Sequence, residues 1–595
     1  MWATAGFALL LTASAGLFLW RMWNVGRVVW SARAEPDYRI GPVGLRIRAF
    51  LAEVLLQGRV IGERPLAGLA HAVVFWGFCV FALATVDHLA QGFGWGFLSE
   101  SGFARFYRRV ADGFAIAVAV AIVGLAARRF IIRPKWLGAL SPESGVIAGL
   151  IFVLMATHLA GAWWPHTIAL LVFLPLIPHT KHLHLILSPL TVFLKRSSFA
   201  HIPPLAGDED FGLDTGRDVT RVAALQAFTC VECGRCMEHC PAHHTGKELN
   251  PKEIALGMRR YLQDFGPQAS EPLLGKHLSL EAVFQCTTCG ACEYQCPVGV
   301  QHLPIIVGLR RGAVNTGKWE DDYGGKLFLN LERYGNPFGL PASERDKFTQ
   351  KNHLPLFDGS QEYCLWLGCM GVFDPRGRET MEALIALLRQ LNVSFGVLRK
   401  EKCTGDAARR LGNDLLFSEL ANFNIDQLRA AKAKRVLSMC PHCVRTIGED
   451  WREFGFTVSI EHHSEFLARH LGKASPADSR RVVFHDPCYL GRYRGTYSAP
   501  REVAAHGGKL LEAPRHGRRS FCCGAGGGLV FLGEEKGERV SAARARELAA
   551  TGAEAIATAC PFCHTMFRDA LAGDGGAPQV VDIAEIAARK IGPKT

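Results

Sequence analysis

The apolar residues of this 595-residue chain are concentrated in its first third. Residues 1–195 contain five apolar stretches, each close to the ~20 residues that an α-helix needs to cross a bilayer. The first stretch lacks a basic leader and is followed by more spans, which predicts a retained helix and not a cleaved signal peptide. The five predicted spans cover roughly residues 3–20, 67–90, 108–127, 144–164 and 167–194.

Basic residues in the connections predict the orientation of these spans. By the positive-inside rule the connections between spans one and two and between spans three and four are cytoplasmic. Everything after residue 195 is then cytoplasmic too, in a multi-pass protein of the cytoplasmic (inner) membrane. The predicted outer side carries Arg105, Arg108 and Arg109, which slightly weakens this prediction of the orientation. The net charge of +12 follows from this topology, so we expect the lipid bilayer and no nucleic acid as a partner. The cytoplasmic residues include Arg27, Arg33, Arg46, Arg59, Arg64, Arg128, Arg129, Arg133 and Lys135.

Histidines in the second and fifth spans form a candidate haem site. His71 and His88 lie near the two ends of span two, and His184 and His166 lie near the same two ends of span five. A separation of 18 residues is five helical turns, which predicts that His166 and His184 share one helix face. Two antiparallel helices of this kind can hold two b-type haems by bis-histidine ligation. Two alternatives remain, since these rings could instead be satisfied by backbone carbonyls, and His158 and His182 compete with His166 and His184 as ligands.

The C-terminal part alternates strand-like and helix-like segments, which predicts two parallel α/β units at residues 360–470 and 480–592. Each unit carries a copy of one cysteine arrangement, with equivalent cysteines 119 or 120 residues apart. Cysteines that follow strands lie at one rim of the sheet, where a metal can be bound. The first copy is Cys369, Cys403, Cys440 and Cys443, and the second is Cys488, Cys522, Cys523, Cys560 and Cys563.

Two further cysteine runs lie between the membrane part and the repeats, within a domain predicted at residues 223–345 that follows a linker at 196–222. Both have the C-x-x-C-x-x-C-x-x-x-C-P spacing of [4Fe–4S] ferredoxins, in which the fourth cysteine of each run ligates the other cluster. Only Cys79 and Cys364 stay outside these patterns, and clustered C-x-x-C pairs favour metal thiolates over disulfides. The sequence predicts two cubane clusters, one on Cys230, Cys233, Cys236 and Cys296 and one on Cys286, Cys289, Cys292 and Cys240.

Several segments resemble known electron-transfer proteins. HAVVFWGF around His71 and IPHTKHLHLILSP around His184 resemble the five-span dihaem cytochrome b subunits of heterodisulfide reductase and respiratory nitrate reductase, which exchange electrons with a quinone or methanophenazine. The helix-forming stretch between Cys240 and Cys286 resembles helical ferredoxins. The second cysteine copy, with its Cys522-Cys523-Gly524 sequence, resembles the CCG domain of heterodisulfide reductase. That resemblance implies a non-cubane [4Fe–4S] cluster on five thiolates, which would be the catalytic site.

The first copy departs from the CCG pattern, because Thr404 stands where the second cysteine of the pair belongs. Four thiolates could hold a cubane, a modified cluster or a structural zinc, and the sequence does not choose among them. The glycine run Gly524–Gly528 lacks the residues of a phosphate-binding loop. Close approach of the backbone to the cluster is the better interpretation.

The whole layout resembles the membrane-bound heterodisulfide-reductase-like oxidoreductases of bacteria. The segment Glu401–Arg410, with its CTGD sequence, resembles electron transfer flavoprotein:menaquinone oxidoreductases. This resemblance implies electron flow from a cytosolic flavoprotein to membrane menaquinone. The alternative is a heterodisulfide or thiol-disulfide reductase coupled to the quinone pool through the same haems. A third alternative is a non-catalytic iron–sulfur anchor for another complex. It is less favoured, because the predicted series of redox groups would then have no function.

Overall fold

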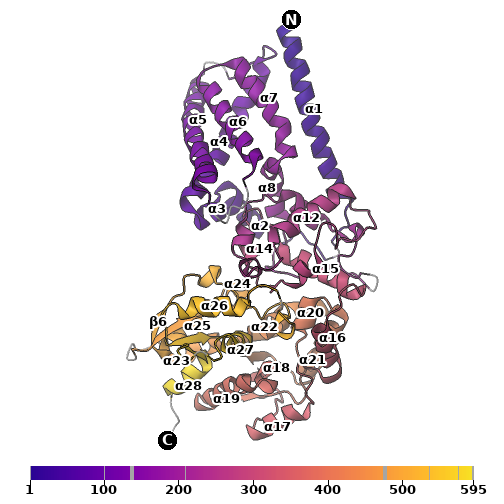
Figure 1. Cartoon of the computed structure of the whole chain (residues 1–595), viewed down its shortest axis with the longest axis vertical. Helices are drawn as coiled ribbons and strands as arrows, with labels where there is room; N and C mark the ends of the chain where they lie inside the picture. Colours follow the sequence, from indigo (N-terminus) through magenta and orange to yellow (C-terminus); the bar gives the residue numbers. More distant parts are fainter. Residues whose placement is uncertain are drawn as a thin grey trace.

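The chain folds into three regions that follow one another along its longest axis (Figure 1). The structure is a computed structural model that describes residues 2–35, 37–98, 101–134, 140–207, 210–472, 479–534, 536–573 and 575–591. A helical N-terminal region lies at one end, a small helical cysteine-rich domain lies in the middle, and two α/β repeats form the other end. Lys135, one of the predicted cytoplasmic basic residues, lies outside the described residues.

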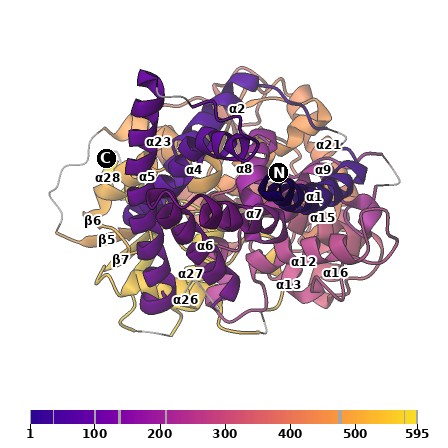
Figure 2. The same ribbon diagram turned by 90° about the horizontal axis from the view of Figure 1, so that it is seen from above.

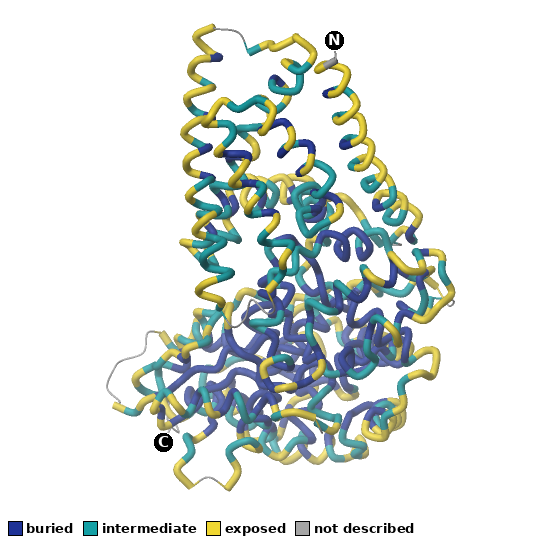
Figure 3. The backbone as a smooth tube through the Cα atoms, turned by 45° about the horizontal axis from the view of Figure 1, so that its top comes forward, coloured by how far each residue is buried: buried dark blue, intermediate teal, exposed yellow. Residues whose placement is uncertain are grey.

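The N-terminal region is built from long apolar helices. Within the described residues, four helices are long and apolar enough to cross a membrane, and a bent pair supplies a fifth if it is counted as one span. Only 11% to 22% of each apolar window is buried, and the rest is exposed or partly exposed (Figure 3), as suits helices surrounded by lipid. The protein is therefore a membrane protein. The four helices are α1 (Trp2–Ser31), α4 (Pro65–Gln91), α5 (Gly102–Ala127) and α6 (Pro142–Leu159).

The fifth predicted span is not one continuous helix. Helix α7 (Trp163–His179) and helix α8 (His184–Leu194) meet at an angle of 84° across a short 3₁₀ turn. Pro175 and Pro178 near the end of α7 remove backbone donors and disfavour a straight continuation. The prediction that His166 and His184 share one helix face is therefore wrong. The connection between the first two spans also forms short helices that were not predicted, α2 (Val43–Ala49) and α3 (Gly58–Glu63).

The middle domain consists of helices that frame two cysteine loops. Side chains of Thr220 and Asn250 cap the first turns of α9 and α12, and Pro251 occupies the first position of α12, where its missing N–H costs nothing. Helix α15 then follows the second loop. The helices of the middle domain are α9 (Arg221–Thr229), α10 (Arg235–Glu238), α11 (Pro241–His244), α12 (Pro251–Asp264), α13 (Leu280–Phe284), α14 (Ala291–Gln295) and α15 (His302–Asn315). Two further helices, α16 (Asp322–Tyr334) and α17 (Ser343–Lys351), pack against the first repeat (Figure 1).

Each repeat contains a four-stranded parallel sheet, which confirms the predicted α/β architecture. The strand orders are β2-β1-β3-β4 and β6-β5-β7-β8, so the two sheets have the same topology. Of the edge strands, β4, β6 and β8 were not predicted. The strands are β1 (Tyr363–Trp366), β2 (Phe395–Gly396), β3 (Arg435–Ser438), β4 (Ser459–His462), β5 (Arg481–Phe484), β6 (Lys509–Leu511), β7 (Ala555–Thr558) and β8 (Gln579–Asp582).

The two repeats face each other and share one core with the middle domain. Helices α19 and α23 of the first repeat pack against α28 and α25 of the second. Seen from above, the repeats spread beneath the membrane helices (Figure 2). The main helices of the repeats are α18 (Gly368–Phe373), α19 (Pro375–Gln390), α20 (Asp406–Leu411), α21 (Asp414–Ala430), α22 (Pro441–Gly448), α23 (His463–Leu471), α24 (Gly491–Arg494), α25 (Ser498–Ala504), α26 (Val540–Ala549), α27 (Pro561–Ala570) and α28 (Ile583–Ile591).

Candidate metal centres

The eight ferredoxin-type cysteines of the middle domain converge in two groups that cross the order of the sequence. Cys296, from the second run, lies beside Cys230 and Cys233 of the first run. Cys240, from the first run, lies beside Cys286 and Cys289 of the second. The structure thus brings together the two ligand sets that the spacing predicts.

The chemistry of these thiols suits iron–sulfur clusters. Burial raises the pKa of Cys230 to about 12 and the pKa values of Cys286 and Cys296 to about 11, so a bound metal has to displace the protons of these thiols. The backbone N–H groups of Thr288 and Val300 donate to the sulfurs of Cys286 and Cys296, each at 3.3 Å. Such hydrogen bonds to thiolate sulfur are a feature of iron–sulfur sites.

The five cysteines of the second repeat lie in the loop after β5, in a loop that follows β6, and at the start of α27. Cys560 is the N-cap of α27, and Cys563 lies in its first turn, where the helix dipole favours thiolates. The Cys563 thiol donates to Cys523 with the two sulfurs 3.1 Å apart, and Cys488 forms a hydrogen bond with Cys522. All five side chains are buried, so the repeat offers a compact set of five sulfur ligands.

The second repeat and the middle domain meet at their cysteines. The Cys289 and Cys522 side chains lie close enough to shift each other's pKa, upward for Cys289 and downward for Cys522. Beside them, the Arg492 guanidinium donates from Nε to the Cys289 carbonyl at 2.8 Å and from Nη1 to the Ser520 carbonyl at 2.7 Å. These contacts place one predicted cubane ligand directly against one ligand of the second repeat.

The glycine run after the cysteine pair forms part of the same contact. A Cβ atom on Gly526 or Gly527 would lie 2.3 Å from the carbonyl oxygen of Thr287 or Cys286, respectively. No side chain fits at that distance, and Gly527 also has a φ of +72°. The backbone approaches the cysteine loop of the middle domain closely, which is the physical reason for glycine at these positions.

The four cysteines of the first repeat are also brought together and buried. Cys369 is hydrogen-bonded to Cys403, and Cys443 is hydrogen-bonded to Cys440. Thr404 occupies the place of the missing cysteine and is buried, and its carbonyl accepts from Trp451 Nε1 at 3.3 Å. The donor set is therefore four thiolates in a protein-enclosed site.

A cavity lies between the two repeats beside the cysteines of the first. Its volume of about 20 Å³ holds roughly one water molecule. Cys369, Cys403 and Cys443 line it from the first repeat, and Ala525 and Phe562 line it from the second. The two repeats thus enclose the cysteine site of the first repeat between them.

A histidine of the first repeat reaches into the second. His442 lies between the cysteines of the first repeat's C-x-x-C pair, and its Nδ1 is 2.9 Å from Asp406 Oδ2. The same ring stacks on Tyr489 with centroids 3.8 Å apart and forms a hydrogen bond with Cys560. Burial raises the pKa of Cys560, but hydrogen bonds from Cys563 and His442 outweigh burial and lower that pKa below its usual value.

Known proteins share this combination of domains. Residues 363–448 and 482–568 each match the family model described as a cysteine-rich domain, CCG, and residues 226–300 match the 4Fe-4S dicluster domain. The chain is 30% identical to the "Probable iron-sulfur-binding oxidoreductase FadF" of Bacillus subtilis, with 92% of each chain covered. It is also 30% identical to the EtfAB:quinone oxidoreductase of Syntrophomonas wolfei, over 96% of this chain and 94% of that one.

The chain belongs to this family of CCG-domain iron–sulfur oxidoreductases. A third relative, from the dihydromethanophenazine:CoB–CoM heterodisulfide reductase of Methanosarcina barkeri, is 29% identical over 64% of this chain and 98% of its own length. This oxidoreductase therefore carries iron–sulfur clusters, and the sulfur-rich sites described above fit them.

The membrane histidines of this oxidoreductase form two groups. Near the dicluster domain, the rings of His71 and His184 have centroids 6.5 Å apart. Farther along the bundle, the rings of His88 and His166 are 4.8 Å apart. The pairs come together although α7 and α8 are bent.

The competing histidines differ in their partners. His158 Nε2 lies 3.1 Å from an Asp112 carboxylate oxygen, while His182 Nδ1 has no hydrogen-bond partner among the described residues. His184 Nδ1 is 2.7 Å from the Lys181 carbonyl, and His166 Nδ1 is 3.1 Å from the Leu154 carbonyl. A ring whose Nδ1–H donates to a carbonyl keeps Nε2 free for a metal.

Direct contacts join the membrane helices to the dicluster domain. Arg59 Nη1 donates to the carbonyl of Cys296 at 2.9 Å. The hydroxyls of Thr191 on α8 and Thr229 on α9 are 2.7 Å apart, immediately before Cys230. Arg64 at the start of α4 pairs with Glu238. One predicted cubane site is thus attached to the helices that carry His71 and His184.

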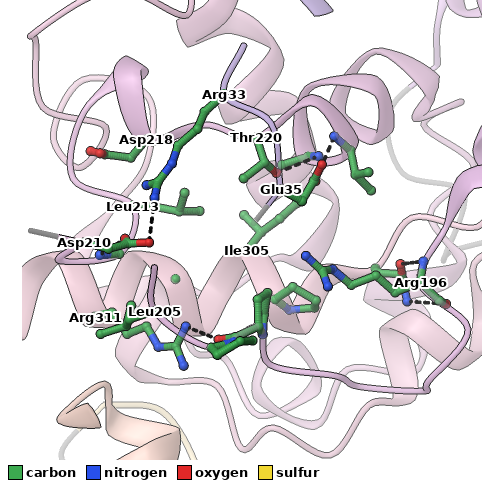
Figure 4. A pocket seen from close by; sticks show the side chains of 18 of the residues that line it. Arg33, Glu35, Arg196, Leu205, Asp210, Leu213, Asp218, Thr220, Ile305 and Arg311 are labelled. Atoms are coloured by element: carbon green, nitrogen blue, oxygen red, sulfur yellow. Dashed lines mark hydrogen bonds and ion pairs between the residues drawn. The ribbon is translucent and has the colours of Figure 1, made fainter. Parts of the chain in front are cut away.

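A second cavity lies at this boundary and is separate from the cysteines (Figure 4). It has a volume of about 80 Å³ and is lined by residues just after α1, the linker, α9 and α15. Its charges are satisfied within the protein: Arg33 pairs with Asp210 at 2.8 Å, and Arg311 donates to the Pro203 carbonyl at 2.6 Å. These contacts hold the linker against the dicluster domain.

Sequence reasoning missed three buried side chains at these centres. His442 bridges the repeats, Arg310 donates to carbonyls of the dicluster domain and both repeats, and one ring nitrogen of His485 lies within 4.8 Å of the sulfurs of Cys523 and Cys563. His485 and His442 lie within three residues of a cysteine in the sequence, which was a usable signal. Arg310 gave none, because its role depends on three segments that meet only in the fold.

Proposed function

We propose that this oxidoreductase passes electrons from a cytosolic flavoprotein, of the electron transfer flavoprotein kind, to menaquinone in the membrane. The observation that carries the proposal is the unbroken line of ligand side chains. It runs from the second repeat through the Cys522–Cys289 contact to the dicluster cysteines, and from Cys296 to the membrane helices with their histidine pairs. The EtfAB:quinone oxidoreductase named above supports the choice of donor and acceptor.

The residues that would hold each group follow from the geometry. When bound, the clusters and two b-type haems would accept and pass on one electron at a time. Eight dicluster cysteines would hold two cubanes, and the five cysteines of the second repeat would hold a non-cubane cluster. His71 with His184 and His88 with His166 would hold the haems, and His88 Nε2 would exchange its 2.7 Å contact with Thr167 Oγ1 for the iron. The four cysteines of the first repeat would hold a further cluster or a zinc ion.

The membrane topology belongs to the same proposal. The Arg-rich connection between α1 and α4 packs on the dicluster domain, because Arg33 N donates to the Val219 carbonyl and Arg59 donates to Cys296. Positive residues favour the cytoplasmic side. The iron–sulfur domains therefore lie in the cytoplasm, beneath a multi-pass domain of the cytoplasmic membrane.

The donor set of the first repeat favours electron relay over disulfide chemistry. Thr404 removes the fifth thiolate from the first repeat, so two equivalent clusters cannot share the two sulfurs of a disulfide. An electron entry site needs only one such cluster.

The test follows haem reduction by rapid-mixing spectroscopy. Purified protein should show b-type α-band absorption, and reduced electron transfer flavoprotein should reduce the haems, which added menaquinone then reoxidises. Cys289→Ala should keep the haem content and abolish this reduction, because it breaks the contact between the dicluster domain and the second repeat. Cys79→Ala, an exposed cysteine of α4, is the matched control.

Normal haem reduction in a Cys289→Ala protein that lacks its cluster would contradict the relay. Fast haem reoxidation by small disulfides, without any response to flavoprotein, would support the alternative.

A further inference from the structure

His485 is placed to act on whatever the second repeat binds. It follows strand β5 directly and precedes Cys488 by three residues. The side chain is 1% exposed, and one of its ring nitrogens lies within 4.8 Å of the Cys523 and Cys563 sulfurs. The ring is held in place by the edge of Phe567, with centroids 4.7 Å apart.

The protonation of this ring is fixed by its neighbour. Arg544 Nε donates to His485 Nδ1 at 3.3 Å. A guanidinium has no acceptor atom, so Nδ1 must be the unprotonated nitrogen, and the single proton of the ring is on Nε2. Nε2 is buried and has no hydrogen-bond partner among the described residues. Buried N–H groups without an acceptor are costly and therefore rare.

The first repeat also has a buried N–H donor beside its cysteines, on a different residue. Trp366 lies 119 residues before His485, the same offset that relates Cys369 to Cys488. It ends strand β1 and is fully buried, and its Nε1, which can only donate, also lacks a partner in the described part of the chain. The Nε1 atom and the Cys443 sulfur both lie within 4 Å of the ideal Cβ position of Gly368.

We propose that the side chain three residues before the first cysteine of each repeat donates an N–H hydrogen bond to a sulfur of the metal group bound there: His485 Nε2–H in the second repeat and Trp366 Nε1–H in the first. The proposal rests on the cluster assigned above to the second repeat. It makes His485 a positioning residue and not a ligand, because a nitrogen that carries a proton has no lone pair for iron. A hydrogen bond to cluster sulfur stabilises the reduced cluster and raises its potential.

The experiment is a redox titration of full-length protein in detergent, monitored by electron paramagnetic resonance. His485→Phe should lower the midpoint potential of the second-repeat cluster, and a tenfold loss in the one-electron reduction equilibrium corresponds to 59 mV. His485→Gln, which retains an N–H donor, should keep most of the wild-type potential. Trp366→Phe should leave this signal unchanged, and the haem potentials should not move in any variant.

Nitrogen hyperfine couplings from protein labelled with ¹⁵N-histidine separate donation from ligation. A weak coupling that disappears in His485→Gln supports the hydrogen bond. A strong coupling typical of a metal-bound nitrogen, an unchanged potential in His485→Phe, or loss of the cluster in both variants overturns the proposal. Absence of any second-repeat cluster signal from the wild-type protein would overturn the cluster assignment as well, so the two failures are distinguishable.

Discussion

The two CCG repeats share one fold and one cysteine spacing, but they differ in the residues around the cysteines. In the first repeat these residues carry charge, and Asp406 accepts from His442 and pairs with Arg410. In the second repeat the equivalent positions are apolar or glycine. Four positions change together: Thr404, Asp406, Arg409 and His442 in the first repeat correspond to Cys523, Ala525, Gly528 and Phe562 in the second.

This difference shows how a duplicated site can divide its roles. The second repeat has the fifth thiolate and lies directly against the dicluster domain through Cys522 and Cys289. The first repeat has an ion-pair network instead, and it contributes His442 to Cys560 of its neighbour. Arg310, fully buried, ties both repeats to the dicluster loop by donating to the carbonyls of Arg410, Gly527 and Cys286.

The largest expected effect comes from giving the second repeat the residue of the first. Cys523→Thr removes the fifth thiolate, so the non-cubane cluster signal should be lost. Flavoprotein-driven haem reduction should fall by more than ~100-fold, since losing a ligand exceeds the ~10–100-fold cost of losing an outer-shell partner. Rapid-mixing spectroscopy measures the rate, and iron analysis measures the cluster. Cys364→Ala, a buried cysteine in strand β1, is the control and should retain both; an unchanged rate in Cys523→Thr would show that the repeats do not differ in this way.

The ion-pair network of the first repeat gives the next largest effect. Burial alone would raise the pKa of Asp414, but Arg311 and Arg409 outweigh it and hold the pKa below its usual value. Asp414→Asn leaves two buried guanidinium groups short of a partner and should cost about 3–5 kcal/mol of stability, measured by thermal unfolding in detergent. Asp426→Asn, an exposed carboxylate on the same helix, is the control.

The pH dependence of the stability gap between the wild type and Asp414→Asn follows from the lowered pKa of Asp414. A carboxyl group whose pKa is lower in the folded state stabilises the fold above its unfolded pKa of about 3.9, and this contribution is lost as the pH falls through the folded value. The stability gap between the wild type and Asp414→Asn should be constant from about pH 6 to 8 and should shrink only below about pH 4. A gap that closes near neutral pH would contradict the ion-pair account.

A smaller effect is expected at the glycine run, which in the first repeat is replaced by helix α20. Gly527→Ala introduces the residue of the equivalent position, Ala408, but its Cβ would meet the Cys286 carbonyl at 2.3 Å. The variant should lose ~1–3 kcal/mol, typical of overpacking, and should slow electron transfer to the dicluster domain. Gly573→Ala, which has a φ of +86° and open space around it, separates backbone strain from this steric clash. Equal losses in both variants would show that the contact with Cys286 is unimportant.

Features that depend on residue spacing were predictable, whereas contacts between distant segments were not. The two cubane ligand sets and the parallel α/β repeats follow from cysteine spacing and strand–helix alternation. The bend between α7 and α8 was missed because hydropathy counts apolar residues and does not register direction, although Pro175 and Pro178 marked the place. Strands β4 and β8 carry no cysteine and complete the sheets from their edges. The contact of Cys289 with Cys522 joins residues 233 positions apart, which no local pattern can indicate.

The smallest expected effect comes from the converse change, Thr404→Cys. It restores the fifth cysteine of the first repeat, yet the new thiol would lie two residues from Asp406, whose buried carboxylate opposes another negative charge. We therefore expect no second non-cubane signal and a rate of haem reduction within about twofold of the wild type, because the first repeat lies off the line from Cys522 to Cys289. The triple variant Thr404→Cys, Asp406→Ala and His442→Phe also replaces the charged neighbours with those of the second repeat, so it should acquire the signal if charge is what separates the repeats. A non-cubane signal from Thr404→Cys alone would show instead that one missing sulfur is the whole difference.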